Sequence, residues 1–301
     1  MRRIILTFLM LTAMSAAAHA DLQDTIQAAA KDAIAQFQNE KLKEEDFAIT
    51  AIDLRDPEHL QIGSFRGDAG IYPASVVKLF YLAAAHRALE DGKLKDSDEL
   101  RRAMKDMIVD STNDATNWIL EAVTDTGNGP MLNDEEMKQW SEKRNAVNRY
   151  FASMGYSGIN VCQKTYNDGP YGRDKIFLGP KLENRNKLTT DATARLLSEI
   201  ALGKAVTPER SKQMRELLHR DMSSESGGND DQAHGFSAKA LPKEAKLWSK
   251  AGWTSTARHD AAYIEMPDGR KLVIVIFTSN HARQRDILPA IVSRILEQTK
   301  P

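Results

Sequence analysis

A serine and a lysine three residues apart, Ser75 and Lys78, have the side chains of a nucleophile and its base. They lie in the stretch IYPASVVKLF, which begins as a turn and continues as a helix. Residues i and i+3 lie on one face of a helix, so we expect the two side chains to be close enough to share a proton. A lysine whose pKa is lowered by burial can accept the proton of a serine hydroxyl. The spacing alone is weak evidence, because most such pairs are solvated on the surface.

A second group of polar residues lies in VDSTNDATN, between two predicted helices. Ser111 could relay a proton there, and Asn113 could hydrogen-bond an amide of a substrate. Serine and asparagine also start helices often, so capping of the second helix is the commoner use of these residues.

A third group lies on a predicted strand, in WSKAGWTST. Gly252 lets a substrate backbone lie against the strand edge. Lys250 supplies a cation to a carboxylate or to a developing negative charge. The alternative is an ordinary strand with an exposed lysine.

The elements that must position these residues follow a simple order. Two strand-like segments come first, helices fill the stretch from about Ser75 to Leu218, and three strands and a helix close the chain. This order predicts an α/β fold of the α+β type. Its antiparallel sheet has about five strands built from both termini and covered by the terminal helices. We expect residues 21–70 and 246–301 to form this α/β lobe and residues 71–245 an inserted helical lobe, with a cleft between the two.

The N-terminus has the three regions of a secretory signal peptide. MRR is basic, IILTFLMLTAM is apolar but too short to span a membrane, and SAAAHA ends in a small-x-small cleavage pattern. We therefore expect residues 1–20 to be removed after Ala20, and the mature protein to be periplasmic or secreted. The alternative is a buried N-terminal helix. Cys162 is alone, cannot form an internal disulfide, and is expected to be a buried, small apolar residue.

Composition excludes some partners. The formal net charge is -1 and no basic block stands out, which argues against nucleic acid. After the N-terminus no run is long and apolar enough to span a bilayer. The seven histidines show no metal-ligand spacing, so we expect no metal and no cofactor. We expect a monomer, in which SSESGGNDDQAHG (223–235) forms a polar surface loop.

The three motifs are more specific together than apart. S-x-x-K opens the first helix after the second strand, S-x-N lies between helices, and K-x-G lies on the first strand after the helical segment. This arrangement resembles the penicillin-recognising serine hydrolases, and class A β-lactamases most closely. The resemblance extends from about Ala48 to Gln298. It includes LTTDATARLL, which is similar to the helix after that family's Ω-loop, and SAKALPKEAKLWSKAG, which is similar to its approach to the K-T-G strand.

The resemblance implies a catalytic role for three residues. Ser75 would be the acylated nucleophile, Lys78 its base or proton acceptor, and Ser111 the donor that passes a proton to the leaving nitrogen. Backbone N–H groups of Ser75 and Trp253 would form the oxyanion hole.

The resemblance also implies a substrate-binding set. Asn113 would hold the amide of the acyl side chain, and Lys250 would anchor the substrate carboxylate. Gly252, Trp253 and Thr254 would complete this set on and after the strand.

Two departures from the family lie in the motifs themselves. Thr112 stands where class A enzymes carry a mainly structural aspartate. Ala251 lacks the hydroxyl that would share the carboxylate with Lys250, and Thr254, Ser255 or Arg258 are candidates to compensate. His259 is a candidate second contact to the site, and a purely structural role is about as common for such a histidine.

The third departure concerns deacylation. Class A enzymes use an Ω-loop glutamate to activate the water that frees the acyl-enzyme. The corresponding place falls near CQKTYNDG, which contains no glutamate. The loop YNDGPYGRDKIFLGPKLENRNKL carries Asp168, Asp174 and Glu183, none in the expected pattern, and Glu183, in KLENRN, is the candidate among them. Acylation is then expected without fast turnover, unless Lys78 serves both steps.

Three functions remain open from the sequence. The first is a periplasmic serine hydrolase that opens β-lactam rings, and so confers antibiotic resistance. The second is a D,D-peptidase-like penicillin-binding enzyme acting on peptidoglycan stem peptides, which the missing glutamate favours over a fast β-lactamase. The third is a protein that binds β-lactams or muropeptides without turnover.

Overall fold

A twisted antiparallel sheet forms the base of the molecule. The computed structural model describes residues 21–228 and 230–300, and the predicted signal peptide lies outside this range. Six strands follow one another in the order β2-β1-β6-β5-β4-β3. They are β1 (Phe47–Asp53), β2 (Gln61–Phe65), β3 (His219–Arg220), β4 (Lys246–Trp253), β5 (Ala257–Glu265) and β6 (Lys271–Ser279). Strands from both ends of the chain therefore share one sheet, which confirms the predicted fold class.

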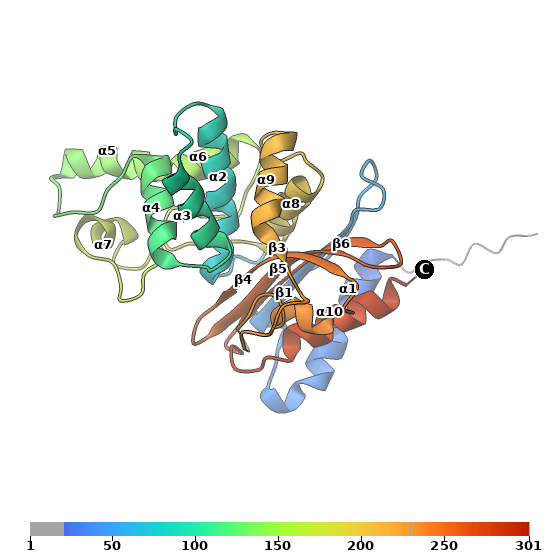
Figure 1. The fold of residues 1–301 in the computed structure, drawn as a ribbon. Helices are drawn as coiled ribbons and strands as arrows, with labels where there is room; N and C mark the ends of the chain where they lie inside the picture. The colour runs from blue at the N-terminus through green and yellow to red at the C-terminus, as the bar shows by residue number, and fades with distance from the viewer. Residues whose placement is uncertain (1–20, 229, 301) are drawn as a thin grey trace, which may run out of the picture.

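The two terminal helices cover one face of this sheet. They are α1 (Leu22–Gln36) and α10 (Ile287–Gln298), which lie side by side below the strands in Figure 1. Apolar residues recur at helical spacing in both helices, and alternate residues of β1 and β6 meet them in one buried cluster. The short helix η4 (Phe236–Ala240) packs into the same cluster.

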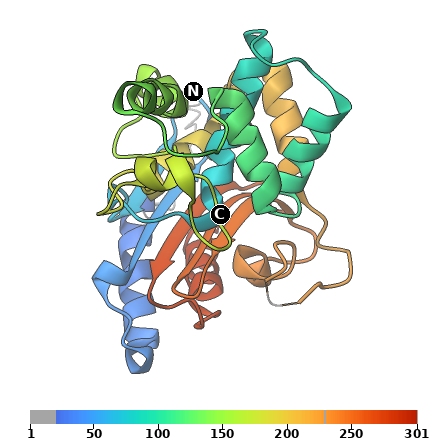
Figure 2. The ribbon, with the colours of Figure 1, turned by 90° about the vertical axis from the view of Figure 1, so that its left-hand side faces the viewer.

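A helical layer covers the other face (Figures 1 and 2). Helix α8 (Thr190–Ala201) lies directly on β1, β5 and β6, and α2 (Lys78–Glu90) runs through the centre of the layer, nearly all of its residues buried. The remaining helices are α3 (Asp98–Ile108), α4 (Asn113–Thr124), α5 (Asp134–Arg144), α6 (Ala146–Ser153), α7 (Gly172–Leu178) and α9 (Pro208–Leu218). Cys162 is buried beside Trp140 and Phe177, as expected for a small apolar residue.

Two details differ from the simplest reading of the sequence. The sheet has a sixth strand, because His219 and Arg220 pair with Trp248 and Leu247 of β4 instead of ending helix α9. The sheet thus begins again at residue 219, inside the segment expected to form the helical lobe. The boundaries of the two lobes remain predictions. Within residues 21–228 and 230–300, no helix has the length and apolar character needed to cross a membrane.

Candidate active site

Ser75 lies in a short helix that is pressed against a strand. It belongs to η3 (Ala74–Val77), a 3₁₀ helix that leads into α2 at Lys78. A Cβ atom at Gly252 of β4 would lie 2.8 Å from Ser75 N and 2.8 Å from Pro73 O. Only glycine permits this approach, because any side chain would meet backbone atoms that cannot move aside. Gly252 therefore brings β4 against the nucleophile candidate.

His259 supports the same turn from behind. It lies opposite Gly252 on β5 and is fully buried. Its Nε2 lies 2.9 Å from the Tyr72 carbonyl, and its Nδ1 accepts a 3.0 Å hydrogen bond from Thr278 N. Burial lowers the pKa of His259 to about 4. A neutral ring with Nδ1 as acceptor and Nε2–H as donor fits both contacts. The structure thus places His259 beneath the Ser75 turn, and not among groups that face the cleft.

Ser111 lies in a tight connection between α3 and α4. Its φ of 58° is in the left-handed region, which is uncommon for a residue other than glycine and concentrates at functional sites. The cap of α4 is Thr112, whose side chain makes no capping hydrogen bond. Neither Ser111 nor Asn113 is used as a side-chain cap, so their polar atoms are available to other groups.

The Lys78 amine is directed toward this connection. Its Nζ donates to the carbonyl of Ser111 at 2.5 Å and to Asn113 Oδ1 at 3.0 Å, and it lies 3.2 Å from Ser111 Oγ. Burial lowers the pKa of Lys78 to about 7. Within the described part of the chain, no hydrogen bond joins it to Ser75. The S-x-N loop therefore holds the Lys78 amine in this structure, and the sharing of a proton with Ser75 stays a prediction.

The Lys250 amine approaches the same hydroxyl from the strand. Its Nζ donates to Ser111 Oγ at 2.9 Å and to Ala251 O at 2.8 Å. Burial, together with the neighbouring charges of Lys78 and Arg220, holds the pKa of Lys250 well below its usual value. The strand lysine is fully buried, which rules out the reading of an exposed strand residue. Ser111 Oγ therefore bridges two buried lysines.

Two further residues complete this side of the site, and sequence reasoning missed both. Gln232 comes from the 223–235 loop, and its Oε1 accepts hydrogen bonds from Lys250 Nζ at 3.0 Å and from Ala251 N at 2.9 Å. Arg220 of β3 donates to the Ser249 carbonyl at 2.8 Å and to Gln232 Oε1 at 3.3 Å. Gln232 lies in a polar loop and Arg220 lies at the end of a predicted amphipathic helix. Neither sequence context indicates a contact with β4.

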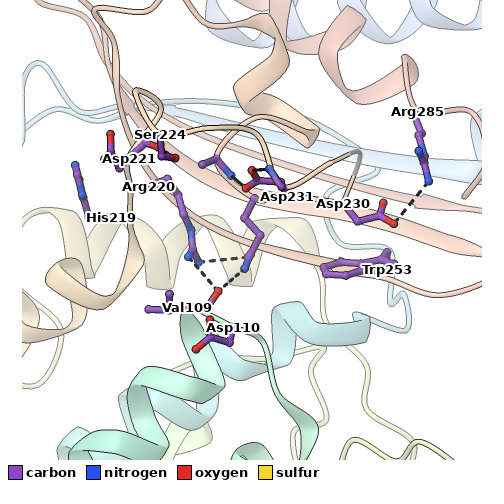
Figure 3. Close-up of a pocket in the computed structure, with 13 residues that line it drawn as sticks. Val109, Asp110, His219, Arg220, Asp221, Ser224, Asp230, Asp231, Trp253 and Arg285 are labelled. Carbon is purple, nitrogen blue, oxygen red and sulfur yellow. Dashed lines mark hydrogen bonds and ion pairs between the residues drawn. The ribbon is translucent and has the colours of Figure 1, made fainter.

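A cavity of about 810 Å³ lies beside this cluster. Figure 3 shows Arg220 and Asp110 near one end of it, and Trp253 near the other, where Asp230 and Arg285 form an ion pair. The cavity thus runs alongside β4, from the S-x-N loop to the residue after Gly252.

The other residues predicted after Gly252 lie around the β4–β5 turn. Trp253 is 37% exposed and its ring packs against Phe236. The Thr254 hydroxyl accepts hydrogen bonds from Thr256 N and Ala257 N, so it is engaged in the turn. Arg258 is buried, lies over the Phe236 ring and forms a 2.8 Å ion pair with Asp230. These contacts do not direct Thr254 or Arg258 toward Lys250.

The segment expected to hold a deacylation base brings an amide to the site. Asn167, within the CQKTYNDG stretch, accepts a 2.7 Å hydrogen bond at Oδ1 from Asn113 Nδ2. The segment is anchored nearby by buried Asp174, which pairs with Arg144 at 2.7 Å and with Lys164 at 3.1 Å. Glu183 lies in an exposed turn after α7, where it accepts from Lys181 N. The stretch therefore reaches the S-x-N loop through Asn167, a residue that carried no signal in the sequence.

Comparison with solved structures gives the same fold. A β-lactamase from Sphaerobacter thermophilus has 19% identity and a TM-score of 0.65, over 92% of this chain and 97% of that chain. A β-lactamase from Chitinophaga pinensis has 17% identity and a TM-score of 0.64, over 92% and 97%. A mutant of the protein PBP-A, solved as an acyl-enzyme complex with penicillin G, has 17% identity and a TM-score of 0.64, over 93% and 97%. At these levels of identity, the similarities establish a shared fold.

Sequence comparison addresses the family to which the chain belongs. No curated protein matches the chain significantly. One family model, described as the beta-lactamase enzyme family, matches residues 97–299, about two thirds of the chain. The match includes the S-x-N and K-x-G motifs and begins after Ser75 and Lys78. With both its family match and its fold in agreement with the predicted resemblance, the chain belongs to the beta-lactamase enzyme family.

Proposed function

We propose that the protein is a serine hydrolase that opens β-lactam rings by forming an acyl-enzyme on Ser75. The observation that carries this proposal is the convergence of Lys78 and Lys250 on Ser111 Oγ, at 3.2 and 2.9 Å. Two buried amines with lowered pKa values beside one hydroxyl form a route for moving a proton. The position of Gly252 against Ser75 N supports the same assignment, because it sets a strand edge beside the nucleophile.

The acylation step uses Lys78 as the base. Ser75 Oγ attacks the carbonyl carbon of the ring and gives its proton to the neutral Lys78 amine. The negative charge that develops on the carbonyl oxygen is stabilised by the backbone N–H groups of Ser75 and Trp253. When the C–N bond of the ring breaks, the nitrogen takes a proton from the Ser111 hydroxyl, which is replenished from the lysines. The product is an ester of Ser75.

Among residues 21–228 and 230–300, no carboxylate forms a hydrogen bond or ion pair with Lys78 or Asn113 that could serve deacylation. A water molecule must attack the ester, and Asn167 is the side chain that Asn113 links to Lys78. A carboxamide does not accept a proton at neutral pH, so water activation falls to Lys78 alone. We infer that the acyl-enzyme of this protein is long-lived.

This inference supports a second candidate function. A long-lived acyl-enzyme is typical of a D,D-peptidase-like penicillin-binding enzyme, whose own substrate would be a peptidoglycan stem peptide. The specific observation that favours it is that Asn113 contacts the carboxamide of Asn167 and not a carboxylate. In either case the signal peptide predicted in residues 1–20 would deliver a monomeric enzyme to the periplasm.

Intact-mass spectrometry of the mature protein tests the proposal. The protein is incubated with a panel of β-lactams, and the mass is followed over time beside a Ser75→Ala variant. An adduct that persists, and that is absent from Ser75→Ala, supports the long-lived acyl-enzyme. A transient adduct with hydrolysed product indicates a true β-lactamase. No adduct and no product would contradict the proposal.

A further inference from the structure

Three hydrogen-bond donors of different chemistry point at one atom, the side-chain oxygen of Gln232. They are the Lys250 side-chain nitrogen at 3.0 Å, the Ala251 backbone N–H at 2.9 Å and the Arg220 guanidinium at 3.3 Å. All three donor residues are buried, and Gln232 is 9% exposed. This convergence describes a site for an oxygen that carries negative charge.

The oxygen that occupies the site is neutral. Arg220 is a buried cation on which the carboxylates of Asp260, Asp231 and Asp110 act. Burial lowers the pKa of Lys250 and so favours its neutral form. A carboxylate would accept from the same three donors, and hydrogen bonds to a charged oxygen are stronger than those to a neutral amide oxygen, so the donor set suits an anion.

The geometry of the strand links this site to the reacting centre. Ala251 N donates away from β5, toward the open side of β4, because its partner is Gln232. Trp253 N, two residues on, has the same direction in an extended strand, and two residues span about 7 Å. The spacing suits a substrate whose carbonyl lies at Trp253 N and whose carboxylate lies at Ala251 N.

We propose that Gln232 is an internal competitor for the substrate carboxylate and thereby sets the affinity of the enzyme for its substrates. This inference rests on the proposed function. The amide fills the carboxylate site in the free protein, and a substrate must displace it. Gln232 also lines the 810 Å³ cavity beside β4, so its side chain can rotate into existing space without movement of the backbone.

One further hydrogen bond of Gln232 must break when a substrate displaces its side chain. Gln232 Nε2 donates to the Val109 carbonyl at 3.1 Å. The same contacts would be expected of a residue that only fastens the loop to the S-x-N connection. If Gln232 is a competitor, removing its oxygen should speed acylation and adding charge to it should slow acylation. If Gln232 is only structural, both substitutions should slow acylation.

The test compares Gln232→Met with Gln232→Glu. Methionine keeps the length of the side chain but cannot accept strong hydrogen bonds, whereas glutamate pairs with Lys250 and Arg220 and stays in place. With benzylpenicillin we expect acylation of Ser75 about tenfold faster in Gln232→Met and about tenfold slower in Gln232→Glu. With the methyl ester of benzylpenicillin, which has no carboxylate, neither substitution changes the rate appreciably. The exposed Gln139, changed to Met and to Glu, is the matched control.

The outcomes separate this inference from the proposed function. If the wild-type protein is acylated but both Gln232 variants are slower with both compounds, Gln232 is structural and the competitor role is overturned. If the wild-type protein is not acylated at all, the proposed function fails, and benzoate then serves as the probe. In a Ser75→Ala background, benzoate should raise the melting temperature more when Gln232→Met is also present. An equal or smaller rise overturns the competitor role.

Discussion

The Asn113 carboxamide donates a 2.7 Å hydrogen bond from Nδ2 to Asn167 Oδ1. The oxygen of the same Asn113 accepts from Lys78 Nζ at 3.0 Å. Asn167 is therefore separated from the proposed base by a single side chain. These contacts lead to two predictions. One concerns a negative charge introduced at Asn167, and the other concerns the protonation of Lys78.

Replacing Asn167 by aspartate should shorten the life of the acyl-enzyme. The carboxylate keeps the size of the side chain and the hydrogen bond from Asn113, and it adds a group that can take a proton from water. General-base catalysis contributes about 10²–10⁴-fold, so we expect deacylation to accelerate by at least about tenfold, given an unoptimised position. Decay of the benzylpenicillin adduct in intact-mass spectra measures the rate.

Asn133→Asp is the control for this change. Asn133 is exposed and caps α5, and aspartate caps a helix equally well. An adduct that decays equally slowly in wild type, Asn167→Asp and Asn133→Asp would show that Asn167 does not lie near the attacking water.

Acylation should depend on pH through Lys78. Burial lowers the pKa of this lysine to about 7, and the neutral amine is the form that accepts the proton of Ser75. Below that pH the amine is protonated and has no free lone pair, so the rate should fall about tenfold per pH unit. Above it the rate should level off. Stopped-flow acylation between about pH 5 and 9 measures the profile, and a flat profile over this range would exclude Lys78 as the base.

Much of the fold was predictable because its signals are local. Apolar residues at helical spacing marked α1, α2 and α10, and β-rich segments marked the five longer strands. The sixth strand escaped, because His219 and Arg220 continue the pattern of α9 and are extended only by pairing with β4. Tertiary pairing overrode a local preference there.

The residues of the site that belong to sequence motifs were predictable. Ser111 and Lys250 were identified from their motifs, and the structure brings their side chains into contact. Gln232 and Asn167 were not, since each reaches the site from a loop and is defined by the distant groups it contacts. The spacing of Ser75 and Lys78 indicated a shared face, but not that Lys78 would be held by Asn113 and Ser111.

Removing the Ser111 hydroxyl should slow acylation more than deacylation. Ser111→Ala deletes the atom that joins the two lysines, and with it the proposed proton donor for the leaving nitrogen. We expect acylation to fall about 100-fold, in the range for loss of one general acid, and the adduct, once formed, to persist. Ser153→Ala, on the exposed face of α6, is the matched control. Equal acylation rates in the two variants would contradict the relay.

Removing the Asp174 carboxylate should destabilise the segment that carries Asn167. Asp174 is buried and pairs with both Arg144 and Lys164, so Asp174→Ala leaves buried Arg144 without a carboxylate partner, while Lys164 keeps Glu121. Breaking a buried pair in this way costs about 3–5 kcal/mol of the free energy of unfolding. Urea denaturation measures the loss. The exposed neighbour Asp168→Ala should cost less than about 0.5 kcal/mol, and a similar small loss for Asp174→Ala would contradict the ionic anchor.

Adding one methyl group at Gly252 should abolish acylation. The new Cβ would lie 2.8 Å from Ser75 N and 2.9 Å from Val76 N, and these backbone atoms can only separate by moving η3 away from β4. The proposed oxyanion hole requires the N–H groups of Ser75 and Trp253 to converge, so a shift of this kind should cost about 10²–10³-fold in rate. The free energy of unfolding should fall by about 1–3 kcal/mol from overpacking. Gly127→Ala is the control, because a Cβ there meets no atom within 4 Å. If Gly252→Ala is acylated at the wild-type rate, β4 does not contribute to the oxyanion hole.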